Sequence, residues 1–131
     1  MLFNFTVSTP ANTLESSKLK TTLEITYGVI HLIELQFPPG PSGYLHVHLN
    51  DALHQVAPYN TDENFASDNL NISFREFIPF LKPPFELSAY TWNLDDTFDH
   101  VVLIRIGILP PSVIAPWLQS YADRMLAAMG L

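Results

Sequence analysis

Apolar and polar residues alternate along much of the chain, most clearly over residues 19–27. Leu19 and Leu23 fall on one side of this stretch, whereas Lys20 and Glu24 fall on the other. A period of two is typical of a β-strand that buries one face and exposes the other to water. Strands are also predicted over residues 3–7, 29–37, 44–49, 70–75, 85–92 and 100–109. The range 100–109 is a nearly continuous apolar run, which suits a central strand that is buried on both faces.

Residues 28–50 predict a β-hairpin, because two alternating runs flank the turn signal PPGPSG. If both apolar sets share one face, the preferred register pairs Leu35 with Leu45, since a slip by one residue would turn one set towards water. This register would place Glu34 opposite His46. A carboxylate and an imidazole in that position would stabilise the pair of strands modestly.

The order of the predicted strands indicates the fold class. About seven to eight strands follow one another at short spacing, with proline-rich and glycine-rich turns and no helix between them, as in an antiparallel β-sandwich or jelly roll. The three prolines of FIPFLKPPF favour a sheet edge or an irregular crossing. After Pro110 and Pro111 the apolar residues recur at helical spacing. We therefore expect a β-domain over residues 1–110 and an amphipathic C-terminal helical tail over residues 111–131.

Composition limits the classes of partner. The 131 residues suit a single domain, and 47% of them are hydrophobic, which is ample for one core. Thirteen acidic residues against six basic ones give a net charge of −7, which argues against nucleic acid and against an anionic membrane. The chain has no cysteine, so it has no thiolate metal ligand. We see no signal peptide, and we expect synthesis and folding in the cytoplasm.

The histidines are the candidates for chemistry. His46 and His48 are the strongest metal-ligand pair, because residues i and i+2 of a strand point to the same face. The HxH resembles that of cupin metal sites, although the glutamate that follows it in cupins is missing here. A third ligand would have to come from elsewhere in the fold: His31, His54 or His100. We favour structural or interface histidines, and expect no cofactor.

No motif of a known catalytic class is present: the chain lacks a nucleophile elbow, a P-loop, a dinucleotide fingerprint and an HExxH helix. Arg105 is the lone charge within the run 100–109, and we expect it to face an edge or to be paired, in preference to a catalytic role. Aromatic side chains could form a sugar-stacking platform, although core or interface positions are more usual in sandwiches: Tyr44, Tyr90, Trp92 and Trp117.

The predicted tail helix supplies the candidate interface. Its apolar stripe must be buried either against its own sheet or against another subunit, and the sequence leaves both alternatives open. The residues that we expect to mediate assembly come first from the tail and then from the strand at 85–92: Trp117, Leu118, Tyr121 and Met125, followed by Tyr90 and Trp92.

The strings FPPGPSGYLHVHL, LHQVAPYN, NFASDN, PFELSAYTWNLDDTFDH and VVLIRIGILP are similar to a group of small all-β proteins from the structural gene sets of bacterial viruses. The resemblance covers roughly residues 3–111 and excludes the tail. It implies a non-enzymatic virion component, such as a capsid decoration, minor capsid or tail protein, that contacts copies of itself or other virion proteins. A carbohydrate-binding or small-ligand-binding module is the alternative, and a cupin-like metal-dependent enzyme that uses His46 and His48 is the third hypothesis.

Overall fold

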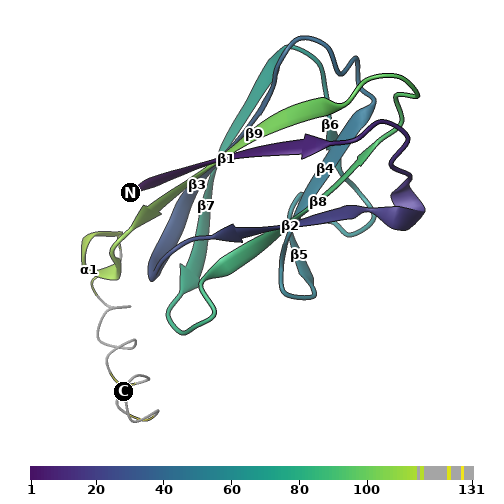
Figure 1. Ribbon diagram of the computed structural model, residues 1–131. Coiled ribbons are helices and arrows are strands. Elements are labelled where there is room, and N and C mark those ends of the chain that lie inside the picture. The colour runs from purple at the N-terminus through teal and green to yellow at the C-terminus, as the bar shows by residue number, and fades with distance from the viewer. Residues whose placement is uncertain (115, 117–123, 125–127, 129–131) are drawn as a thin grey trace.

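The computed structural model describes residues 1–114, 116, 124 and 128. It confirms the predicted class, because almost all of the described elements are antiparallel strands and a short helix follows them (Figure 1). Most of the predicted tail lies outside the described residues. The elements are β1 (Leu2–Thr9), the 3-10 turn η1 (Glu15–Ser17), β2 (Leu19–Glu24), β3 (Gly28–Phe37), β4 (Leu45–Asp51), β5 (His54–Ala57), β6 (Phe65–Ala66), β7 (Leu70–Phe80), β8 (Glu86–Asn93), β9 (His100–Leu109) and α1 (Pro111–Ile114).

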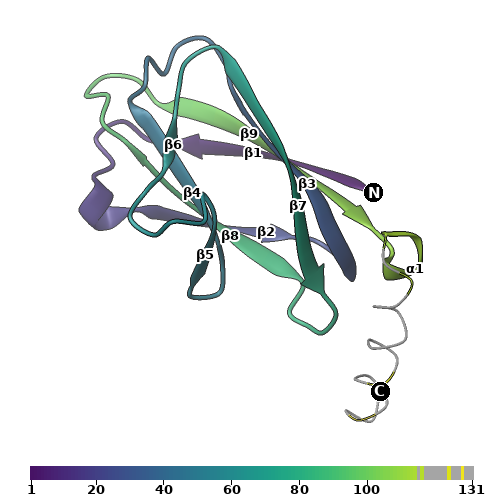
Figure 2. The same ribbon diagram turned by 180° about the vertical axis from the view of Figure 1, so that it is seen from behind.

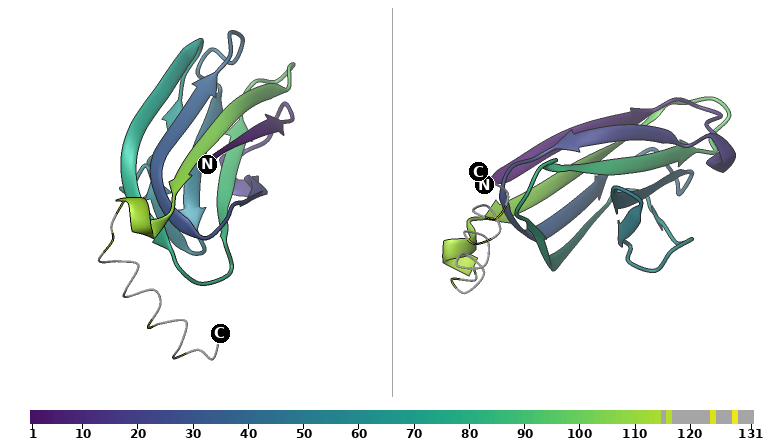
Figure 3. Two further views of the ribbon diagram at one scale, coloured as in Figure 1. Left: turned by 90° about the vertical axis from the view of Figure 1, so that its left-hand side faces the viewer. Right: turned by 90° about the horizontal axis from the view of Figure 1, so that it is seen from below.

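Two sheets lie face to face as two layers (Figures 2 and 3). Sheet A has the strand order β1-β9-β3-β7, and sheet B has the order β2-β8-β4-β5, with the short β6 also paired to β4. The partners are nested along the chain: β1 pairs with β9, β2 with β8, β3 with β7 and β4 with β5. This nesting is that of a long hairpin rolled up on itself, which makes the sandwich a jelly roll.

The predicted hairpin of residues 28–50 is wrong, because β3 and β4 belong to different sheets. Leu35 lies beside Ile72 and Ile104 in sheet A, whereas Leu45 pairs with Asn93 in sheet B. The two apolar faces do meet, but across the sandwich instead of side by side. The connection between β3 and β4 therefore crosses from one layer to the other. Alternation shows which face of a strand is buried, but it does not show which strand lies beside it.

One hydrophobic cluster fills the space between the sheets. It draws fully buried side chains from both inner faces, among them Ile33 and Phe37 of sheet A and Leu45 and Leu87 of sheet B. A fully buried side chain of this size contributes about 1.5–3 kcal/mol relative to an exposed one. The interior is thus a packed core, and the surfaces of the sandwich are left to carry any contact with another molecule.

The short helix α1 follows β9 at one end of the sandwich (Figure 1). Ile114 of α1 packs there with Tyr27 against a small second cluster formed by Val29 and Leu81. Within the described residues, no helix has the length and the apolar character that a membrane crossing requires.

Candidate functional site

His46 and His48 share one face of β4, as the HxH spacing predicts, and this face is the outer one. The core side of the strand is occupied by Leu45 and its alternate neighbours. The His46 ring stacks on Trp92 with the ring centroids 5.0 Å apart and the planes 3° from parallel. Its Nδ1 lies 2.7 Å from Oδ1 of Asn64, to which it donates a hydrogen bond.

His48 is held on both of its ring nitrogens. Nδ1 donates to Asn50 Oδ1 over 2.8 Å, and Nε2 accepts from the Lys18 ammonium over 3.1 Å. The ring also stacks on Tyr90. Burial lowers the pKa of His48, and the charge of Lys18 lowers it further. The hydrogen bond to Asn50 and the charge of Glu15 raise the pKa but do not cancel this effect. The imidazole is therefore kept neutral, as the acceptor of a lysine hydrogen bond.

This arrangement does not support the cupin-like hypothesis. In a histidine metal site, a ring nitrogen gives its lone pair to the metal, yet Nε2 of His48 already faces the ammonium of Lys18. The other histidines lie apart from this pair: His31 at a register shift in sheet A, His54 at the start of β5 and His100 beside Asp95. Among the residues that the structure describes, no group of three His, Asp or Glu side chains is arranged to hold a metal ion.

The structure describes only some of the residues that were predicted for an interface or a sugar-stacking platform. Trp92 is 3% exposed, because His46 stacks on it and Lys18 Nζ lies 4.8 Å from its ring centroid. Its ring offers a partner almost no surface. Tyr90 is half-buried against His48, while Tyr44 is exposed just before the start of β4. The tail residues predicted for the interface lie outside the described part of the chain: Trp117, Leu118, Tyr121 and Met125.

A polar network closes the end of the sandwich where β8 turns into β9. The amide of Asn93, fully buried, donates to the carbonyl oxygens of Thr9 and Phe98. His100 Nε2 and Asp95 Oδ2 are 2.7 Å apart. The backbone N–H of Thr97 and the side chain of His100 are the main causes that lower the pKa of Asp95. These bonds hold the loops at this end of the sandwich in place, so the role of the network is structural.

Arg105 is a paired charge, as expected. Its Nη2 donates to Gln36 Oε1 over 2.7 Å, and Nη1 lies 3.7 Å from Glu34 Oε2 on the outer face of sheet A. Glu34 therefore stands beside Arg105 and Ser73, and not opposite His46 as the predicted hairpin required.

The hollow that best suits a binding site lies between β5, at the edge of sheet B, and β7, at the edge of sheet A. It measures about 230 Å³, and we call it the edge groove. Two carboxylates, an imidazole, a phenol and apolar side chains line it: Asp51, His54, Val56, Tyr59, Glu76, Phe77, Ile78 and Pro79. An apolar hollow with a few convergent polar groups is the usual form of a binding site. The sequence alone missed it, because its walls come from segments that only the fold brings together.

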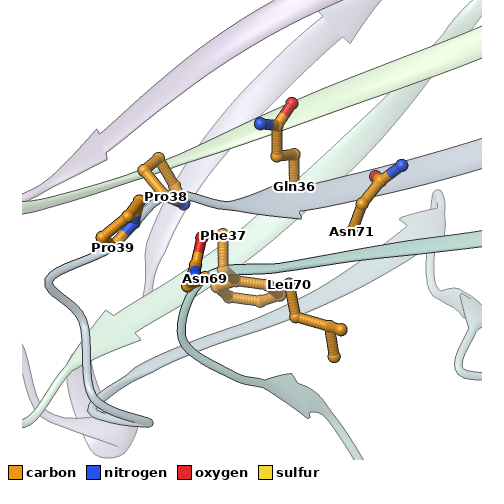
Figure 4. A pocket seen from close by; sticks show the side chains of 7 residues that line it. All are labelled: Gln36, Phe37, Pro38, Pro39, Asn69, Leu70 and Asn71. Atoms are coloured by element: carbon orange, nitrogen blue, oxygen red, sulfur yellow. The ribbon is translucent and has the colours of Figure 1, made fainter.

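A second hollow of about 230 Å³ lies between the end of β3 and the start of β7 (Figure 4). Its polar groups are the amides of Gln36, Asn69 and Asn71. Gln36 already accepts a hydrogen bond from Arg105. Because this hollow has no ionisable lining, the edge groove is the stronger candidate.

Comparison with known proteins adds no assignment, since no protein-family model matches the chain and no curated protein matches it either.

Proposed function

We propose that this protein is a non-enzymatic structural subunit, a virion component such as a capsid decoration, minor capsid or tail protein, which works through protein–protein contacts. The observation that carries the proposal is the position of its exposed apolar side chains. Six of them lie near the two ends of β4, three at each end, and the interior between the sheets is filled by the core.

The first patch surrounds the edge groove. Leu53 is 98% exposed in the turn between β4 and β5, and Tyr59 is 72% exposed after β5. Phe77 of β7 completes the patch, and about half of its surface is accessible. Exposed apolar side chains beside a hollow favour a contact site on a soluble protein.

The second patch lies at the other end of β4, where the strand pairs with the last residue of β8. Tyr44, Leu94 and Phe98 are all exposed there, and the backbone N–H of Leu94 donates to the carbonyl of Tyr44. Two separate patches on one molecule would let the subunit contact two neighbouring proteins at once. Jelly rolls also occur in viral capsids, a fold-level analogy that agrees with the resemblance of residues 3–111.

Sedimentation velocity over a range of concentrations tests the proposal on the full chain and on a chain that ends at Ile114. This truncation keeps the contact of Ile114 with Val29 and Leu81. We expect the full chain to assemble through its tail and the truncated chain to remain a folded monomer, which leaves the two patches for contacts with other proteins. A second variant, Trp117→Ser with Tyr121→Ser, should dissociate the assembly without unfolding the sandwich. A variant that unfolds would instead assign the tail to the core, and a full chain that is monomeric at every concentration would contradict self-assembly.

The alternative function is a carbohydrate-binding module, which is favoured by the exposed ring of Tyr59 beside the carboxylates of Asp51 and Glu76. Aromatic faces pack against sugar rings, and carboxylates accept hydrogen bonds from their hydroxyls. A panel of neutral glycans titrated against the labelled protein in NMR spectra should shift groove resonances if this alternative is correct. Unchanged spectra at millimolar glycan would remove it.

A further inference from the structure

We propose that the edge groove is the docking site for a basic segment of a partner protein, which inserts an arginine side chain between Asp51 and Glu76. The inference rests on the proposed function and adds the chemistry of the partner. It is carried by the charge of the groove, by its aromatic lining and by the form of the strand edge beside it.

The two carboxylates come from different sheets and line one hollow. Asp51 ends β4 in sheet B, and Glu76 lies in β7 of sheet A at the register shift opposite His31. Both are half-buried, and neither takes part in a side-chain hydrogen bond or an ion pair within the described part of the chain. Half-buried carboxylates without a cation have lost part of their hydration without compensation. A guanidinium placed between them would restore charge-assisted hydrogen bonds to both.

The lining suits the flat face of a guanidinium. The rings of Tyr59 and His54 are 5.2 Å apart and nearly perpendicular, with an interplanar angle of 79°, so one ring supports the other at the mouth of the groove. Arginine stacks on aromatic faces and presents donors in a planar fork, whereas a lysine ammonium is a compact point charge without that fork. Tyrosine and arginine are also the side chains on which protein interfaces most often depend.

The strand edge argues against a second copy of β7 as the occupant. Near the groove, β7 carries the charged Glu76 on its inward side, a register shift and Pro79, which lacks an N–H. These are the devices that prevent one sheet edge from pairing with another. The groove therefore accepts a side chain better than it accepts a strand.

Charge selects the partner. The chain carries a net charge of −7, and the exposed patch at Tyr44 and Leu94 lies beside Asp95 and Asp96. A second copy that offered this patch to the groove would bring carboxylates to carboxylates, which is repulsive. Lys82 lines the adjoining hollow of about 210 Å³ together with Asp51, yet among the described residues the two form no ion pair. A basic segment is the complementary partner.

Three short peptides test the proposal by NMR titration of the full, isotope-labelled chain: one with a central arginine, one with lysine and one with citrulline, whose urea group keeps the shape without the charge. We expect the arginine peptide to shift the resonances of the groove. It should bind at least about tenfold more tightly than the citrulline peptide, because citrulline cannot form charge-assisted bonds. The double variant Asp51→Asn, Glu76→Gln should weaken the arginine peptide by a similar factor.

The control variant Glu24→Gln removes an exposed carboxylate from β2, outside the groove, and should leave the affinity unchanged. Equal affinity for arginine and citrulline, or an unchanged affinity in the double variant, would overturn the proposal. Neutral glycans that shift the same resonances, or self-association that the double variant abolishes, would assign the groove to another occupant and overturn it too. Sedimentation of the full chain reports on assembly separately, so the arginine site and the subunit role can fail independently.

Discussion

At the scale of single residues, Gly28 shows how closely the two ends of the fold are packed. It begins β3 with φ +147°, and a Cβ atom there would lie 2.6 Å from Ile108 Cγ2 and 2.9 Å from the carbonyl oxygen of Leu109. A side chain has no space there, and the backbone conformation is one that L-residues rarely adopt. The sequence shows only an isolated glycine after an alternating run. The reason for it is the approach of β9, which lies far away along the chain.

Replacing Gly28 by alanine should lower the free energy of unfolding by about 3 kcal/mol, because overpacking adds to backbone strain. Gly43→Ala is the matched control, since Gly43 has φ +81° but no atom lies within 4 Å of the place that a Cβ would take. The control should lose only the backbone contribution, about 1 kcal/mol. Urea unfolding followed by circular dichroism measures both variants. Equal losses would show that contact with β9 is not the reason for glycine at this position.

At the scale of elements, the segment before β2 is fastened to the outer face of sheet B by a lysine. Lys18 follows η1 and donates to His48 of β4, while its ammonium lies over Trp92 of β8. One side chain thus joins three segments that are distant in the sequence. The contact depends on a neutral His48, because a protonated imidazole has no lone pair for the ammonium.

This contact predicts a pH dependence. The folded-state pKa of His48 is lowered, first by burial, so the unfolded state binds a proton before the folded state does as pH falls. The contribution of His48 to the free energy of unfolding is therefore complete above about 6.5 and is lost as pH falls from that value through the folded pKa. NMR titration should place the His48 pKa below its ordinary value. Lys18→Met should raise it, since the ammonium helps to lower it, and Lys82→Met should not change it. A His48 pKa at or above its ordinary value would contradict the assignment.

At the scale of the whole molecule, the two sheets share one core. The cluster contains Leu35 and Ile104 from sheet A together with Leu49 and Leu87 from sheet B. Neither sheet can bury its inner face without the other. The nested pairing also means that β1 must find β9 across almost the entire chain before sheet A is complete.

The sandwich should therefore unfold in a single cooperative transition. Leu35→Ala in sheet A should lower the free energy of unfolding by about 2–5 kcal/mol. The fluorescence of Trp92 in sheet B and the backbone signal should then show the same shift in the midpoint of unfolding. Trp92 is followed by fluorescence in a Trp117→Phe background, and the backbone by circular dichroism. The control Ile114→Ala removes a half-buried side chain from outside the main core and should cost less. Separate midpoints for the two signals would show that the sheets unfold independently.

The sequence by itself determined which faces are buried. Alternation placed strands at β2, β3, β4 and β7 and predicted a sandwich or jelly roll, because one-sided burial requires a period of two in any sheet. It also predicted that Arg105 is paired or faces an edge and that the prolines around β7 mark an edge or an irregular crossing, since an isolated buried charge and a missing N–H are costly wherever they occur. The structure shows Arg105 beside Glu34 and places β7 at the edge of sheet A. These properties depend on each residue and its near neighbours.

Only the tertiary structure decided which strands are neighbours. The loop between β3 and β4 resembles a hairpin turn, but competition for partners across the whole chain places β9 and β7 beside β3. The same long-range pairing brings Lys18 to His48 and brings Asp51 and Glu76 to one groove. No local sequence pattern predicts these contacts, because the residues that form them are far apart in the sequence and are brought together only by the folding of the jelly roll.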